Sequence, residues 1–290
     1  MSKRLWLGLA VVAILLAGCE EVRPTPLPTR TRMPEIAPSP TVNPVLPSVD
    51  PFTQPGQNIP EAAAAPSGMD IEGVVPLPGE FSYEVVASQD RLRLQAMLYP
   101  ADVQPAPAVL LLPMLNGRKE DWRPLVPVLQ QAGYTVLTVD LRGQGATGGT
   151  PNWTQARQDV LDMLADLQAM DGVDGERIAV IGAGIGANLA LTGCAVSNFC
   201  DAVAVLSPGL DDQGVLTEGA VTQLGNRPLL LVAAVDDTVA AAAAQRLDGL
   251  AGGPHDLLLL EGSARGTALL QARPDLPGTL LAWLNANLQR

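Results

Sequence analysis

The sequence predicts an α/β fold in which a mostly parallel sheet of about eight strands carries helices on both faces. From about residue 79 onward, short runs of Leu, Val, Ile and Ala alternate with longer stretches of helical periodicity. Compact apolar runs are typical of parallel strands that are buried on both faces. Strands that alternate with helices form parallel sheets, because each helix returns the chain to the edge where the next strand begins. Apolar residues make up 47% of the 290 residues, which is enough for a large core.

Eight strands and five helices are expected in chain order. Residues 81–88 and 91–99 alternate apolar and polar side chains, which predicts two antiparallel strands. Six compact runs follow, at 108–113, 134–140, 177–183, 202–207, 227–235 and 256–261. The expected helices cover 122–131, 154–170, 185–195, 239–250 and 276–288.

The connection between the sixth and seventh strands, of about 20 residues, is too short for a cap domain. We therefore expect any cleft at this end of the sheet to be shallow and open. Within the connection, Asp211 and Asp212 are expected to start a loop or to cap a short helix. Asp171 and Asp174 are too few ligands for calcium and indicate a helix-to-strand turn, so we expect no metal and no cofactor.

The first 18 residues resemble the signal peptide of a bacterial lipoprotein. Lys3 and Arg4 precede an apolar stretch at residues 5–17, which is shorter than an ordinary membrane span. The stretch ends in Leu-Ala-Gly-Cys at 16–19, similar to a lipobox, which implies cleavage before Cys19 and lipid attachment to it. We therefore expect an extracytoplasmic protein of the cell envelope, held at the bacterial membrane through lipidated Cys19. The alternative is an ordinary signal peptide with an incidental cysteine.

Residues 19–78 are expected to be a disordered, proline-rich tether that joins the lipid to a folded domain at 79–290. Residues 20–78 contain 14 of the 26 prolines and few large apolar side chains. Such a composition cannot offset the entropy lost on ordering. An interaction motif within this segment is the alternative interpretation.

The net charge of −12 argues against nucleic acid as a partner, because phosphates require a basic surface. We expect a monomer. Cys194 and Cys200 are expected to form a disulfide, because exported proteins fold in an oxidising compartment. The alternative is that both are small buried hydrophobic residues.

Three motifs in the right order make residues 80–290 resemble the α/β-hydrolase fold, in its dienelactone-hydrolase and serine-peptidase-like branch. Residues 110–122, Leu-Leu-Leu-Pro-Met-Leu-Asn-Gly-Arg-Lys-Glu-Asp-Trp, are similar to the strand and loop that supply the oxyanion hole. Residues 133–145 end in Asp-Leu-Arg-Gly-Gln-Gly, similar to the family's Asp-x-Arg-Gly-x-Gly turn. Residues 177–191 have the strand, glycine turn and helix of a nucleophile elbow, Gly-x-Ser-x-Gly.

Two of the three triad positions implied by this resemblance hold residues without the required chemistry. Gly184 stands at the place of the nucleophilic serine. Arg265 stands at the place of the histidine, and its guanidinium stays protonated and cannot act as a base. The acid is retained, with Asp236 matching the family spacing best and Asp237 as the alternate. The resemblance also implies that the amides of Leu115 and Ile185 are the oxyanion donors.

Other residues could restore catalysis only if the site were rebuilt. His255 is the single histidine and begins the last strand, roughly 20 Å from the edge where such sites lie, so we expect it at the surface. Ser207, Ser263 and Thr267 lie near the expected cleft but have no evident base. Lys119 could reach the cleft and serve such a serine, or it could be a solvated loop charge.

The sequence therefore predicts a catalytically degenerate hydrolase-like protein, a pseudoenzyme that binds a protein partner of the envelope or a small anion in the vestigial cleft. Arg265 is expected to form a buried ion pair with Asp236 that plugs the old triad. Alternatively, Arg265 points into the cleft and binds a carboxylate or phosphate. The rival interpretations are an active esterase, dienelactone hydrolase or peptidase with non-standard catalytic residues, and a purely structural lipoprotein.

Overall fold

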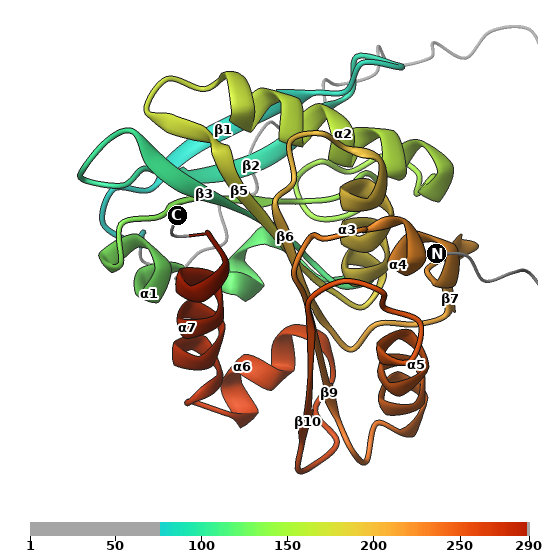
Figure 1. Cartoon of the computed structure of the whole chain (residues 1–290). Helices are drawn as coiled ribbons and strands as arrows, with labels where there is room; N and C mark the ends of the chain where they lie inside the picture. Colours follow the sequence, from blue (N-terminus) through green and yellow to red (C-terminus); the bar gives the residue numbers. More distant parts are fainter. Residues whose placement is uncertain (1–75, 289–290) are drawn as a thin grey trace, which may run out of the picture. The chain divides into compact units, whose positions relative to one another are not determined.

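An eight-stranded sheet forms the centre of the structure, a computed structural model that describes residues 76–288 (Figure 1). Strands β1 and β2 run antiparallel to each other, β2 runs antiparallel to β4, and all the remaining neighbours are parallel. The predicted fold class is confirmed. In spatial order the strands are β1 (Phe81–Val86), β2 (Arg93–Tyr99), β4 (Thr135–Val139), β3 (Ala106–Leu112), β5 (Val173–Ala183), β6 (Ala202–Leu206), β9 (Leu229–Ala234) and β10 (His255–Leu260).

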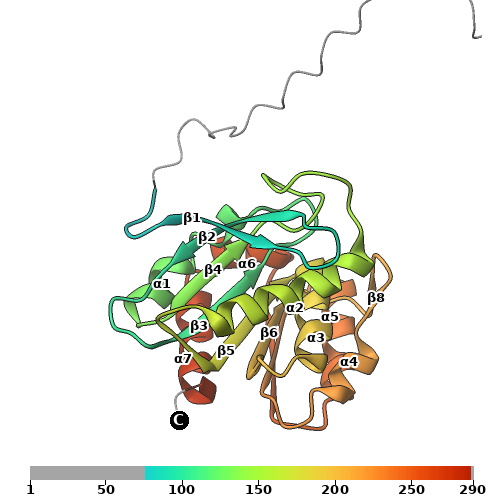
Figure 2. The same ribbon diagram turned by 90° about the horizontal axis from the view of Figure 1, so that it is seen from above.

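Helices cover both faces of this sheet (Figures 1 and 2). One face carries α2 (Trp153–Ala169), α3 (Ile185–Val196), α4 (Glu218–Gln223) and α5 (Thr238–Asp248). The other carries the 3₁₀ helices η1 (Lys119–Trp122) and η2 (Gly266–Ala268) together with α1 (Val126–Gln131), α6 (Leu269–Ala272) and α7 (Leu276–Leu288).

The core consists of two layers because successive strand residues point to opposite faces of the sheet. On β3, Leu110 packs with α2 and α3, whereas its neighbour Leu111 packs with α1 and α7, and both are fully buried. The same alternation holds along β5, β6 and β9. Both faces of the parallel strands are therefore apolar, as the compact runs in the sequence predict.

The connection between β6 and β9 differs from the expectation. Asp211 and Asp212 neither start a loop nor cap a helix but form β7 (Asp211–Asp212), which pairs with β8 (Val215–Leu216). Gln213 and Gly214 both have positive φ, 54° and 80°, which is the backbone that a two-residue hairpin turn requires. The short helix α4 follows this hairpin.

The predicted disulfide is confirmed and lies at the end of the sheet away from Gly184. Cys194 near the end of α3 is bonded to Cys200, which precedes β6, with Cα atoms 5.2 Å apart. The Arg227 guanidinium donates to the carbonyl oxygens of Cys194 (2.6 Å) and Ser197 (2.7 Å), which satisfies the last turn of α3.

The signal peptide, Cys19 and the proline-rich tether lie outside the described residues. Within residues 76–288, no helix combines the length and the apolar character needed to cross a membrane.

Candidate functional site

Gly184 forms a sharp turn between a strand and a helix at the carboxyl edge of the sheet. Strand β5 ends at Ala183, and α3 begins at Ile185. Gly184 has φ 53° and ψ −121°, a left-handed conformation that side chains rarely adopt. Its amide donates to the carbonyl oxygen of Leu206 (3.0 Å), which ties the turn to β6. The backbone of a nucleophile elbow is present without a nucleophile.

The outer glycines of the motif are required by close backbone approaches. A Cβ on Gly182 would overlap the carbonyl group of Gly186. A Cβ on Gly186 would overlap the carbonyl oxygens of Leu112 and Pro113 at the end of β3. Both glycines therefore let α3 start directly against β5 and β3, as the elbow pattern implies.

The side chain of Met114 lies between the elbow and the loop that follows β10. A Cβ placed on Gly184 would be 3.1 Å from the Met114 Cβ. A Cβ placed on Gly266, whose φ is 57°, would be 2.8 Å from the Met114 Sδ. The Met114 side chain thus occupies the space that side chains at positions 184 and 266 would need. A serine at 184 would have to share this space with the methionine.

Arg265 forms an ion pair with Asp237, and the predicted pairing with Asp236 is wrong. The Arg265 Nη1 lies 3.2 Å and 3.4 Å from the two carboxylate oxygens of Asp237. The Asp237 side chain is only 10% exposed, and it also caps α5 by accepting from the Ala240 amide (3.4 Å). Asp236 is exposed, and its amide donates to the carbonyl oxygen of Gly262 (3.0 Å). The chain turns after β9, so that the second of the two aspartates faces Arg265.

A second carboxylate lies near this ion pair. Burial raises the pKa of Asp212, and the nearby positive charge of Arg265 opposes that rise only in part. Asp212 belongs to the β7–β8 hairpin, so the hairpin approaches the loop that carries Arg265. The Arg265 side chain is 42% exposed, forms an ion pair with Asp237 and lies near enough to Asp212 for its charge to act on that carboxylate.

Ser207 is buried beneath the site and has a structural contact. It follows β6 with a φ of 53°, and its Oγ accepts a hydrogen bond from the amide of Gly266 (2.9 Å). Among residues 76–288, no histidine or carboxylate side chain hydrogen-bonds to this hydroxyl. Ser263 is exposed, whereas Thr267 is 7% exposed. The structure therefore pairs none of these hydroxyls with a base.

His255 lies at the surface, as predicted, at the start of β10. Its Nδ1 is 2.8 Å from the carbonyl oxygen of Gly253. Its Nε2 is 3.6 Å from a carboxylate oxygen of Asp248 at the end of α5. His255 thus lies at the amino ends of the strands, whereas Gly184 lies at their carboxyl ends.

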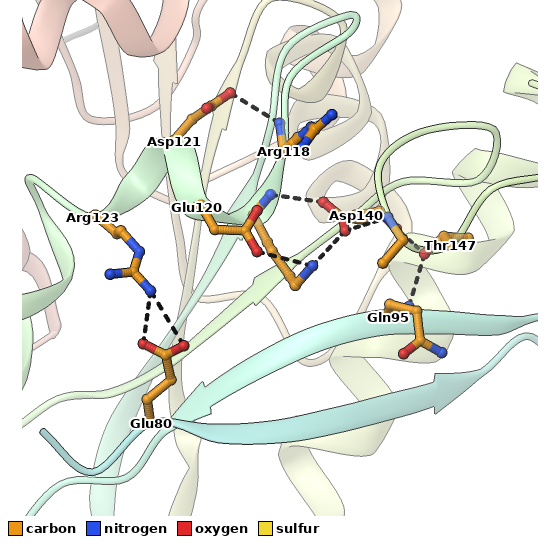
Figure 3. A network of polar contacts seen from close by, with 10 residues as sticks. Glu80, Gln95, Arg118, Glu120, Asp121, Arg123, Asp140 and Thr147 are labelled. Atoms are coloured by element: carbon orange, nitrogen blue, oxygen red, sulfur yellow. Dashed lines mark hydrogen bonds and ion pairs between the residues drawn. The ribbon is translucent and has the colours of Figure 1, made fainter. Parts of the chain in front are cut away.

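Lys119 is neither a free cleft residue nor a solvated charge. Its Nζ lies 2.6 Å from Asp140 and 3.1 Å from Glu120, and its side chain is 11% exposed (Figure 3). Burial alone would lower the pKa of Lys119, but the hydrogen bonds and charges of Asp140 and Glu120 outweigh burial and raise it. A lysine held in its charged form by two carboxylates cannot serve as a base.

Asp140 connects the loop after β3 to the turn after β4. Besides the Lys119 ammonium, its carboxylate accepts from the amides of Lys119 and Ala146, both at 2.8 Å (Figure 3). A Cβ on Gly145 would overlap the Asp140 carboxylate, which explains the last glycine of the Asp-Leu-Arg-Gly-Gln-Gly turn. This network holds in place the loop that carries Met114.

The family model of the alpha/beta hydrolase fold matches residues 107–251, which is half of the chain. The chain belongs to the α/β-hydrolase fold family. The matched region includes the loop with Met114, the elbow at Gly184 and the Asp236–Asp237 pair.

The similar proteins include a transferase and hydrolases. A polyketide transferase of Stachybotrys chlorohalonatus is 30% identical over 129 residues, which is 43% of this chain and 43% of that relative. The chain thus matches less than half the length of this relative. Among solved structures, the α/β hydrolase GrgF from Penicillium superposes with a TM-score of 0.64 at 17% identity, over 74% of this chain and 100% of that one. The dienelactone hydrolase of Anabaena variabilis has a TM-score of 0.58 at 16% identity, over 72% and 96%. These solved structures show the shared fold.

Within this hydrolase fold, the amides at the expected oxyanion positions remain available. The N–H groups of Leu115 and Ile185 have no acceptor among residues 76–288. Met114 immediately precedes Leu115, and Gly184 immediately precedes Ile185. The two amides that the resemblance implies as oxyanion donors are therefore unpaired in the described part of the chain.

Sequence reasoning missed two residues that shape this hydrolase-fold site. Asn188 is fully buried in α3, donates to the Val215 carbonyl (2.7 Å) and accepts from the Gly209 amide (3.0 Å), which fixes the β7–β8 hairpin. Its signal was an amide side chain in a largely apolar helix. Met114 lies within the motif at 110–122, but its position between Gly184 and Gly266 depends on loops distant in sequence.

Two cavities lie away from this site. One is lined by the loop after β4 and the start of α2, including Asp90, Arg142 and Gln155. The other is lined by residues near the disulfide, including Asp201 and Arg227. Neither includes Gly184, Met114 or Arg265 among its lining residues.

Proposed function

We propose that this protein is a lipid-anchored, extracytoplasmic member of the α/β-hydrolase fold family that has lost hydrolysis and acts by binding a protein partner. The observation that carries the proposal is the position of Met114, whose side chain fills the space between Gly184 and Gly266. Nucleophile and base would have to meet in this space.

Acyl transfer requires a nucleophile, a base that accepts its proton, and donors for the oxyanion. Gly184 has no side chain, and Arg265 is a permanent cation in an ion pair with Asp237. Only the donors remain, at Leu115 and Ile185. Donors alone do not form or break a covalent bond, so the chemistry of the family is lost in this proposal.

A protein partner fits the site better than a small anion does. Met114 occupies the space beside the amide donors, and the charge of Arg265 is already compensated by Asp237, with Asp212 nearby. By contrast, large apolar side chains are exposed in the connections that follow β6 and β9. These are Leu210 (38%), Leu216 (63%), Val235 (43%) and Val239 (68%). These residues follow the carboxyl ends of β6 and β9, which are neighbours in the sheet, and exposed apolar surface there favours a protein partner.

The membrane anchor rests on the signal-like N-terminus with Lys3, Arg4 and Cys19. We expect the full-length protein in the membrane fraction of an expressing bacterium and the Cys19→Ser variant in the soluble envelope fraction. Metabolic labelling with a clickable palmitate should mark the first protein only. Equal membrane retention of both proteins would contradict lipid anchoring.

The loss of hydrolysis is tested with a fluorophosphonate probe on the full-length protein. We expect no labelling, because no described serine has a base. The Ser207→Ala variant is the matched control, since Ser207 is the buried serine nearest to the elbow. Labelling that disappears in this variant would support the rival, an active hydrolase with a relocated nucleophile.

Restoring the site provides a second test. The Gly184→Ser/Arg265→His variant should stay inactive toward p-nitrophenyl acetate, because Met114 still lies 3.1 Å from the new Cβ. Adding Met114→Gly should permit measurable hydrolysis, with Asp237 placed to orient the new histidine. The same triple variant with alanine at 184 is the control and should remain inactive. Activity in the double variant would show that Met114 does not block the site.

Two further measurements separate the protein partner from the small anion. Acetate and inorganic phosphate should not raise the melting temperature of the protein. A rise that is lost in Arg265→Gln would favour the anion. In expressing cells, a photoreactive residue at Leu216 or Val239 should cross-link to another protein, and one at Phe81, which is 57% exposed on β1, should not.

A further inference from the structure

The strand β10 is an open edge of the sheet. Among residues 76–288 it pairs only with β9, and its sequence, His-Asp-Leu-Leu-Leu-Leu, contains no proline and no lysine. Leu257, Leu258 and Leu259 are only partly buried. Edge strands of soluble proteins are usually protected by charges, proline or bulges, and a long apolar edge favours pairing with another strand.

The hydrogen bonds of β10 show which of its backbone groups are free to pair. The carbonyl of Pro254 accepts from Leu229 (3.0 Å), and the carbonyl of Leu260 accepts from Val235 (2.8 Å). Because backbone groups alternate along a strand, the even-numbered residues face β9. The amides and carbonyls of His255, Leu257 and Leu259 therefore face away from the sheet.

One antiparallel register satisfies these backbone groups and also matches the side chains. If a two-fold axis passes through Leu258, then Leu257 lies opposite Leu259 of a second copy, and both residues have outward-facing backbone groups. His255 then lies opposite Glu261, and both are exposed. The register places six leucines, Leu257, Leu258 and Leu259 of each copy, in the centre and a polar histidine–glutamate pair at each end, with Asp256 opposite Leu260 between them.

We propose that two copies of this chain associate through the edges of their β10 strands, antiparallel and centred on Leu258. The two sheets then form one continuous sheet. The proposal departs from the monomer expected from the sequence, and it does not depend on the proposed function.

The helices beside β10 are compatible with this arrangement. Helix α5 packs over β9 and β10. With each α5 over the groove between β9 and β10, the two copies of α5 would be two strand spacings apart. At a strand spacing of about 4.8 Å this is about 10 Å, an ordinary packing distance for helices. Helix α5 reads Thr-Val-Ala-Ala-Ala-Ala-Ala-Gln-Arg-Leu-Asp, and its small side chains allow close approach.

The opposite edge of the sheet is a poorer interface. Strand β1 exposes Phe81, Ser82, Glu84 and Val86, so its solvent-facing positions mix apolar, polar and charged side chains. Glu84 is also held by Arg93 in an ion pair at 2.6 Å. A charged edge of this kind disfavours pairing.

A charge exchange tests the register with exposed residues only. His255→Glu places two carboxylates opposite each other at both ends of the interface. Sedimentation equilibrium of the full-length chain in density-matched detergent should show a dimer whose dissociation constant rises about three- to tenfold in this variant. Adding Glu261→Lys should restore the dimer. Because Glu261→Lys does not alter the contact of residue 255 with Asp248, recovery would assign the effect to the interface.

Cross-linking tests the position of the two-fold axis. In the Leu258→Cys variant the two new thiols face each other across a close antiparallel pair, so mild oxidation should give a band of doubled mass on a non-reducing gel. Leu257→Cys, a matched change on the other face of the same strand, should not cross-link. A monomeric wild-type chain without a cross-link at either position would overturn the proposal, as would cross-linking at 257 in place of 258.

Discussion

Gly184 has a φ of 53° and a ψ of −121°, which only glycine adopts at little cost. Alanine at this position would be strained, and its Cβ would press on the Met114 Cβ at 3.1 Å. We expect Gly184→Ala to lower the free energy of unfolding by about 1–3 kcal/mol. Urea denaturation followed by tryptophan fluorescence measures this change.

Gly219→Ala is the matched control for that substitution. Gly219 lies in α4 without a positive φ, and no atom lies within 4 Å of an added Cβ. Alanine there should stabilise the protein by about 0.4–1 kcal/mol. A Gly184→Ala variant as stable as the wild type would mean that the elbow can relax, and the positive φ would then not explain the glycine.

Lys119 differs from the surface cations because its ion pair with Asp140 is buried. Removing the ammonium leaves the Asp140 carboxylate, 1% exposed, with only two backbone donors. We expect Lys119→Met to destabilise the protein by about 3–5 kcal/mol in urea denaturation. Arg93→Met breaks an exposed pair with Glu84 and should cost less than about 1 kcal/mol. Equal effects would contradict the role of burial.

Asp212 gives a pH-dependent prediction. Its pKa in the folded state is raised, so the unfolded chain releases this proton at lower pH than the folded chain does. The ionised carboxylate therefore destabilises the fold at neutral pH, and Asp212→Asn should raise the midpoint of urea denaturation at pH 7. The difference should vanish below about pH 3.9, where both states are protonated. Asp102→Asn, at an exposed position, is the control and should leave the midpoint of urea denaturation unchanged at both pH values.

At the scale of elements, the disulfide stabilises the junction between α3 and β6. Six positions separate Cys194 and Cys200 along the chain, so the closed loop is short. Cross-linking a loop of this size contributes about 2 kcal/mol by restricting the unfolded chain. We expect the Cys194→Ala/Cys200→Ala variant to lose about this amount in urea denaturation. Dithiothreitol should reproduce the loss in the wild type and leave the variant unchanged.

The elements that the sequence predicts well are those with a long periodic pattern. The eight strands of the central sheet were expected in order, and α2, α3, α5 and α7 begin and end within a few residues of their predicted bounds. The β7–β8 hairpin and α4 were missed, because they are short and are held by tertiary contacts from Asn188. The elbow was predicted from local motifs, whereas the Arg265–Asp237 pair depends on how the chain turns after β9. Such a turn moves the partner of Arg265 from Asp236 to Asp237, and no sequence pattern indicates this change.

At the scale of the whole molecule, the two core layers share one sheet. Trp153 packs in the layer of α2 and α3, and Trp122 and Trp283 pack in the layer of α1 and α7, so tryptophan fluorescence reports on both. Each parallel strand contributes side chains to both layers. Loss of packing in one layer should therefore weaken the sheet on which the other layer depends.

Leu110→Ala and Leu111→Ala test this coupling at adjacent, fully buried positions on opposite faces of β3. Each should lower the free energy of unfolding by about 2–5 kcal/mol, because each leaves a cavity in a close-packed layer. If the layers unfold together, fluorescence and far-UV circular dichroism should give one coincident urea transition in both variants, with an unchanged slope. Independent layers would instead give two transitions in Leu110→Ala, with Trp153 exposed first and Trp122 and Trp283 still buried. That result would show that each layer of helices unfolds on its own and that the shared sheet does not make the fold one cooperative unit.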